Sequence, residues 1–163
     1  MRIDRKAIIF LLILVLFSIL LGCTNKSQRG NSTMDSEITQ YVDKDYSGSG
    51  VDILLSDFTE FDWDRVLVFN YPTSAKEIEN ALNVQYDGSL DLISGIIFVK
   101  GDKITYEEIF KDDYESPPRF FIYPNRDINA RPKYRVFTRD TAAFECIRQE
   151  YKDYNYYKLI PKE

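Results

Sequence analysis

Residues 92–110 read LISGIIFVKGDKITYEEIF and carry the strongest structural signal in the chain. The first half, up to Lys100, is a long apolar run that is typical of a buried strand. Gly101 and Asp102 then supply the residue types of a tight turn. The second half, residues 103–110, partly alternates between polar and apolar side chains, as a returning strand does. The stretch therefore predicts an antiparallel hairpin.

Strand patterns on both sides of this hairpin extend it to a sheet. β-branched and aromatic residues predict further strands at residues 65–69, 119–123, 133–138 and 143–148, and an edge strand at 154–160. Ala142, Ala143, Cys146 and Ile147 also fit one face of a helix. We favour a strand there because Phe144, Cys146 and Arg148 alternate and the surrounding segments are sheet-like.

One short helix is expected at residues 75–82. Thr73 or Ser74 can cap its first turn, and Glu77 follows Ser74 at the spacing of a capping box. Together the patterns predict an α+β fold, mainly antiparallel sheet with one or two short helices.

Composition excludes several classes of function. The chain of 163 residues has no histidine and two cysteines, so Ser-His-Asp and Cys-His catalytic arrangements and the common zinc sites are impossible. The formal charge of −5 argues against nucleic acid as a partner, because that would require a basic surface. We therefore expect no enzyme activity, no cofactor and no metal.

The N-terminal segment is basic and then strongly apolar. Three basic residues within the first six positions precede an apolar run at residues 7–21, and Gly22 and Cys23 follow. This segment resembles a bacterial lipoprotein signal peptide with its lipobox. The resemblance implies that residues 1–22 are removed, that Cys23 carries lipid, and that the mature protein is anchored to the extracytoplasmic face of the cell membrane.

Two other interpretations of this segment remain open. An uncleaved transmembrane anchor is one, although an apolar helix of about 23 Å is shorter than a hydrocarbon core of about 30 Å. An ordinary secretory signal is the other, although the small-x-small cleavage pattern is incomplete. All three place the rest of the chain outside the cytoplasm, because positive charge precedes the apolar run.

The remainder divides into a tether and a domain. Residues 23–50 are mostly small and polar, and Ser47-Gly48-Ser49-Gly50 is typical of a flexible boundary. We expect a lipidated N-terminus and flexible tether over residues 23–50 and a single domain over 51–163. Loss of residues 1–22 moves the formal charge from −5 to about −7.

The first candidate site is the run Phe61-Asp62-Trp63-Asp64. With the strand and the Tyr-Pro-Thr-Ser turn that follow it, this run resembles small uncharacterised lipoproteins of Gram-positive bacteria, for which no activity is established. On a strand, Asp62 and Asp64 would share one face and Trp63 the other. Trp63 is expected to anchor the core, and the two aspartates are a candidate cation or catalytic pair.

The second candidate site is basic and aromatic. Arg131 and Arg135 lie among further basic residues and tyrosines, and they could grip an anionic wall polymer or an acidic partner. Tyrosines near the C-terminus, at positions 151, 154, 156 and 157, either complete the core or form a binding surface. Cys146, with no histidine to activate it, is expected to be a buried apolar residue.

The function expected from these features is binding at the cell surface. The leading hypothesis is a membrane-anchored lipoprotein that acts as a protein-binding or inhibitor-like module with an envelope protein as partner. One alternative is a cation-dependent envelope factor or enzyme that uses Asp62 and Asp64. Another is a receptor for an anionic wall polymer that uses Arg131 and Arg135.

Overall fold

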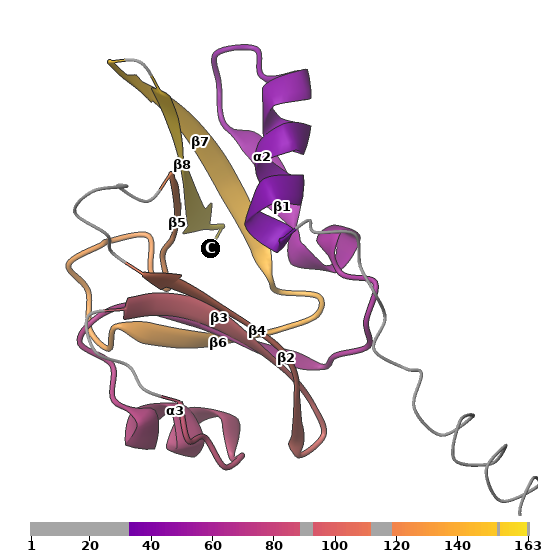
Figure 1. Cartoon of the computed structure of the whole chain (residues 1–163), viewed down its shortest axis with the longest axis vertical. Helices are drawn as coiled ribbons and strands as arrows, with labels where there is room; N and C mark the ends of the chain where they lie inside the picture. Colours follow the sequence, from indigo (N-terminus) through magenta and orange to yellow (C-terminus); the bar gives the residue numbers. More distant parts are fainter. Residues whose placement is uncertain (1–32, 89–92, 112–118, 153, 163) are drawn as a thin grey trace, which may run out of the picture. The chain divides into compact units, whose positions relative to one another are not determined.

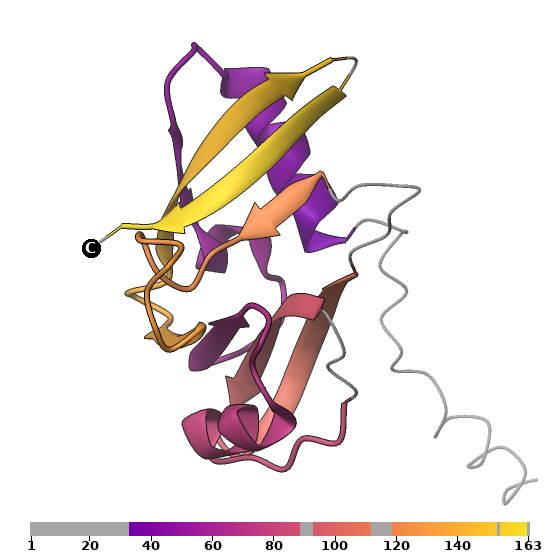
Figure 2. The same ribbon diagram turned by 90° about the vertical axis from the view of Figure 1, so that its left-hand side faces the viewer.

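Two four-stranded sheets and two α-helices make up the described part of the protein (Figures 1 and 2). The computed structural model describes residues 33–88, 93–111, 119–152 and 154–162. In spatial order, sheet A contains β1 (Val51–Leu54), β7 (Ala143–Tyr151), β8 (Tyr154–Pro161) and β5 (Phe120–Ile122). Sheet B contains β4 (Lys103–Lys111), β3 (Ile93–Lys100), β2 (Arg65–Phe69) and β6 (Tyr134–Thr138). The helices are α2 (Met34–Asp45) and α3 (Ala75–Leu82), with a 3-10 turn η1 (Leu55–Phe58) after β1. The predicted α+β class, mainly antiparallel, is confirmed.

The hairpin expected at residues 92–110 is formed by β3 and β4, which pair antiparallel with Lys100 opposite Lys103. Gly101 in the turn has a φ of 61°, a left-handed conformation that glycine adopts without strain. Ile96 and Phe98 point into one hydrophobic cluster, while Ile97 and Val99 point into a second. Burial on both faces explains why the β3 sequence is continuously apolar.

The second cluster lies between sheet B and α3. Ile78 and Leu82 from the helix pack there with Leu67 and Phe69 of β2. The expected capping box is present, since the Ser74 side chain accepts from the Glu77 backbone N–H and the Glu77 carboxylate accepts from the Ser74 backbone N–H. The predicted boundaries of this helix are confirmed.

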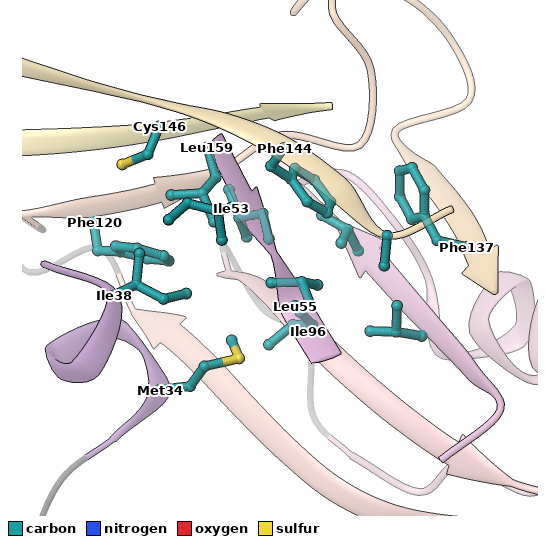
Figure 3. Packing of buried hydrophobic residues seen from close by; sticks show 14 of the residues in the cluster. Met34, Ile38, Ile53, Leu55, Ile96, Phe120, Phe137, Phe144, Cys146 and Leu159 are labelled. Carbon is teal, nitrogen blue, oxygen red and sulfur yellow. The ribbon is translucent and has the colours of Figure 1, made fainter. Parts of the chain in front are cut away.

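The first cluster joins the two sheets and α2 (Figure 3). The inward residues of sheet A, such as Phe144 and Leu159, meet Ile96 and Phe137 of sheet B there. Cys146 is fully buried in this cluster, as expected. The core therefore extends across both sheets.

Helix α2 corrects the predicted tether. Met34, Ile38 and Val42 are almost fully buried in the first cluster, so residues 34–45 are part of the folded unit, which begins at Thr33. The prediction of a flexible tether to residue 50 is wrong for these residues. The three buried side chains recur every four residues, and they form an apolar stripe that lies against the core.

The C-terminal strands form at the predicted residues, but β8 has a different place in the sheet. Residues 143–148 are in a strand, β7, and β8 follows it as an antiparallel partner. However, β8 is an inner strand and not an edge, because β5 pairs with it in parallel, with Phe120 opposite Tyr157. A parallel partner strand is joined through a long connection, so no local sequence pattern predicts the pairing.

Several predictions fall outside the described residues. These are the signal peptide at residues 1–22, the lipidated Cys23 and the tether up to residue 32. Within the described ranges, neither helix combines the length and the apolar character needed to cross a membrane.

Candidate functional site

Trp63 occupies the position that the sequence predicts. It is 1% exposed and packs edge-on against Phe98, with ring centroids 5.0 Å apart. Its indole Nε1–H donates to Thr59 Oγ1 at 2.8 Å, which satisfies the polar atom of the ring. The run that carries it precedes β2 and is not itself part of a strand.

Asp62 and Asp64 point outward on either side of Trp63, and each contacts protein groups. Asp62 makes ion pairs with Lys100 Nζ at 3.0 Å and with Arg139 Nη1 at 3.6 Å. Asp64 Oδ2 accepts the Gly101 backbone N–H at 2.8 Å, and this bond is the main reason that the pKa of Asp64 is lowered. The two carboxylates therefore tie the β3–β4 turn and the β6–β7 turn to the segment before β2.

A cation site at these aspartates finds no support in their geometry. Their contacts are the cationic and N–H groups that a metal ion would have to displace. Among the described residues, no group of three or more acidic or cysteine side chains lies close enough together to hold a metal ion.

Arg131 and Arg135 are both exposed but lie in different environments. Arg135 is on the edge strand β6, with its guanidinium 5.0 Å from the centroid of the Phe137 ring. Arg131 precedes that strand, near enough to Glu77 to contribute to the lowered pKa of that carboxyl. No hydrogen bond or ion pair between described residues connects either arginine to Asp62 or Asp64.

A different site, which we call the α2 cleft, is formed between α2 and the end of sheet A. It is an open cavity of about 670 Å³, within the range of ligand-binding pockets. Helix α2 runs alongside β7 and β8 in both views of the protein (Figures 1 and 2). Asp35, Thr39 and Asp43 line the helix wall, each one position after a buried core residue. The same helix therefore supplies an apolar stripe to the core and a polar stripe to the cleft.

The opposite wall comes from sheet A and from the β7–β8 turn. Arg119, immediately before β5, lies with its guanidinium 5.7 Å from the centroid of the Tyr154 ring. Lys152 in the turn and Asn155 on β8 complete this wall together with Tyr157. Backbone pairing fixes the wall, since the Tyr157 N–H donates to the Arg119 carbonyl at 2.8 Å.

A hydrogen-bonded network forms the base of the cleft. The Tyr157 hydroxyl donates to Asp43 Oδ1 at 2.7 Å, and Arg148 Nη1 lies 3.3 Å from the same oxygen. Arg148 also stacks on Tyr46, at 5.0 Å from the ring centroid. In the amide orientation that satisfies both groups, Asn155 Oδ1 accepts from Arg148 Nη2 at 3.0 Å. Burial, with the Asp43 hydrogen bond, raises the pKa of Tyr157 to about 12, so its hydroxyl stays protonated.

Glu108 holds the first turn of α2 in place. Its carboxylate, on β4, accepts from the Met34 backbone N–H at 3.2 Å and from the Tyr106 hydroxyl at 2.7 Å. This substitutes for an N-cap, because the side chain of Thr33 makes no capping hydrogen bond. Burial raises the pKa of Glu108. Sheet B therefore positions the helix whose polar face lines the cleft.

Sequence reasoning identified only part of this site. Tyr154 and Tyr157 stand in the tyrosine-rich segment that was expected to serve either the core or a binding surface, and in the structure Tyr157 does both. The polar stripe of α2 was missed because the composition of residues 34–45 predicts a tether. A recurrence of apolar residues at positions 34, 38 and 42, with polar residues one position later, was the available signal.

Comparisons with protein-family models, with curated proteins and with solved structures find no match to this chain.

Proposed function

We propose that this protein is a lipoprotein anchored through Cys23 to the extracytoplasmic face of the cell membrane, where it binds an envelope protein in the α2 cleft. The single observation that carries the binding role is the cleft itself. Its base is fixed by a hydrogen-bonded network, and its walls present charged and tyrosine side chains. A fixed polar site of this kind binds without a large ordering cost. The lipobox resemblance supports the anchor.

Binding is favoured over catalysis by the state of the reactive groups. Burial raises the pKa of the Cys146 thiol to about 12, which keeps it protonated and a poor nucleophile. Asp62 and Asp64 contact protein groups, as described above. These observations support a module whose work is recognition.

The test is crosslinking in the native host, followed by capture of the protein and mass spectrometry. We expect one envelope protein to be enriched with the wild-type chain and to be lost with Cys23→Ala, which cannot take lipid. Palmitate labelling should disappear in the same variant. Arg119→Gln should also lose the partner although it keeps the anchor.

The matched control is Arg135→Gln, which removes an exposed arginine from a strand that does not line the cleft. Partner capture should be unchanged in this variant. Loss with Arg135→Gln and retention with Arg119→Gln would contradict the cleft as the binding site and would favour the basic stretch around β6.

A further inference from the structure

The two walls of the α2 cleft differ in the sign of their charge. The helix wall carries the carboxylates of Asp35 and Asp43, while the sheet wall carries the cationic groups of Arg119 and Lys152. Glu150 is the exception on the sheet side, and its carboxylate pairs with Arg148 Nη2 at 3.4 Å. A ligand that satisfies both walls must itself present one positive and one negative group.

The helix wall retains a capacity to accept hydrogen bonds. Between described residues, the Asp43 carboxylate has contacts from Tyr157 and from Arg148, and both are made to Oδ1. The Oδ2 atom of the same carboxylate can therefore accept from an ammonium group, which is a donor only. Thr39, one turn earlier in the helix, adds a hydroxyl to the same wall.

The sheet wall offers a planar cation that is held in place. Between described residues, the guanidinium of Arg119 contacts the face of the Tyr154 ring. This contact does not use the guanidinium N–H groups, so they can donate hydrogen bonds to a ligand. Such a group matches a carboxylate in geometry as well as charge, since two parallel N–H donors meet two oxygens. Tyr154 and Tyr157 add rigid apolar area between the two walls.

We propose that the α2 cleft binds a short peptide segment, with an ammonium group directed to Asp43 on the helix wall and a carboxylate directed to Arg119 on the sheet wall. This proposal rests on the proposed binding function and specifies its ligand. A cavity of about 670 Å³ has the size for a segment of a few residues.

The test uses the full-length chain in detergent micelles and a randomised mixture of tripeptides with free termini. Binding is measured by saturation-transfer NMR and titrated by calorimetry. We expect the free mixture to bind and its affinity to fall at least tenfold when the N-termini are acetylated or the C-termini are amidated.

Variants assign each charge to its wall. In Arg119→Gln the free and the amidated mixtures should bind equally, because the partner of the carboxylate is gone. In Asp43→Asn the free and the acetylated mixtures should bind equally. Should Asp43→Asn fail to fold, Asp35→Asn tests the same wall and should weaken the effect of acetylation. Arg135→Gln and Asp140→Asn, both exposed and outside the cleft, should behave as wild type.

Three outcomes overturn the proposal. Equal binding of free and doubly blocked mixtures would show that the cleft does not recognise the charges of the peptide termini. Binding that is weakened by amidation but not by acetylation, and that is unchanged in Asp43→Asn, would show a simple anion site at Arg119. Absence of peptide binding, with Arg119-dependent capture of a partner in the host, would leave the proposed function standing and remove this ligand class. Peptide binding without any captured partner would support the cleft ligand and contradict the protein partner.

Discussion

Trp63 is the residue on which the packing before β2 depends. Its ring lies against Phe98, Arg139 lies over it at 5.5 Å from the ring centroid, and Thr59 receives its N–H. Arg139 lies in the β6–β7 turn and also pairs with Asp62. This turn therefore contacts the segment before β2 at two neighbouring residues. Removing the ring would leave a large void that these neighbours cannot fill.

Trp63→Ala is therefore expected to lower the free energy of unfolding by about 3–5 kcal/mol. Urea denaturation followed by circular dichroism measures the change. The matched control is Tyr71→Ala, which removes an aromatic ring that is 58% exposed and should change the stability little. A loss below about 1 kcal/mol for Trp63→Ala would contradict its role as a core anchor.

At the residue scale, the sequence predicted which side chains are buried or exposed better than it predicted which groups they contact. Trp63 is buried and the side chains of its two neighbours are exposed, as expected, although the run precedes β2 and is not part of a strand. The partners of Asp62 could not be predicted, because Lys100 and Arg139 are far away in the chain and meet it only through sheet pairing. The cation hypothesis arose from this missing information.

At the element scale, α2 shows how burial outweighs composition. Its sequence, MDSEITQYVDKD, contains many polar residues and no cap from its own N-terminal side chain. A helix of this length is marginal when isolated, so its stability must come from the buried stripe and from Glu108 on β4. The amino-acid composition of residues 34–45 shows neither the buried stripe nor the contact with Glu108. The segment therefore resembles a tether in sequence.

Ile38→Ala tests this directly, because Ile38 is fully buried in the middle of the stripe. We expect a loss of about 2–5 kcal/mol in the free energy of unfolding, measured by chemical denaturation. Gln40→Ala, on the exposed face of the same helix, should have almost no effect. Equal stability of the two variants would return residues 34–45 to the tether.

Helix α3 carries a pH dependence with a defined sign. The Ser74 backbone N–H and hydroxyl lower the pKa of Glu77 below its ordinary value of 4.5. A carboxyl whose pKa is lower in the folded state stabilises the protein above its unfolded pKa, and this contribution is lost as the pH falls through the folded pKa. The capping box should therefore weaken in acid.

We expect Glu77→Gln to be less stable than the wild type at neutral pH, with the difference shrinking below about pH 4.5. Thermal denaturation across pH 3–7 measures it. The difference should depend less on pH in a Ser74→Ala background, which loses the hydroxyl donor but keeps the backbone N–H. A difference that persists unchanged into acid would exclude ionisation of Glu77 as its source.

At the scale of the whole molecule, one core serves both sheets, since sheet A and sheet B contribute side chains to the same cluster. The sequence predicted the strands and the α+β class. It could not predict how they divide between two sheets, because β1 pairs with β7 and β6 pairs with β2 across long stretches of chain. Such pairings are fixed by the complete core and not by any local pattern.

The shared core predicts a single cooperative unfolding transition. Trp63 fluorescence reports on the junction between the sheets, and far-ultraviolet circular dichroism reports on all the strands. We expect the two urea curves to coincide, as in a two-state domain. Separate midpoints would indicate that the layer of α3 and sheet B unfolds independently.

The start of the folded unit at Thr33 limits where such a protein could work. If Cys23 carries the lipid, only residues 24–33 separate the bilayer surface from α2, and ten residues span at most about 35 Å even when fully extended. Asp35, which lines the cleft, is the second residue of α2. This linker is then too short to reach a distant target. A partner would have to be another protein of the same membrane or a molecule that approaches the membrane surface.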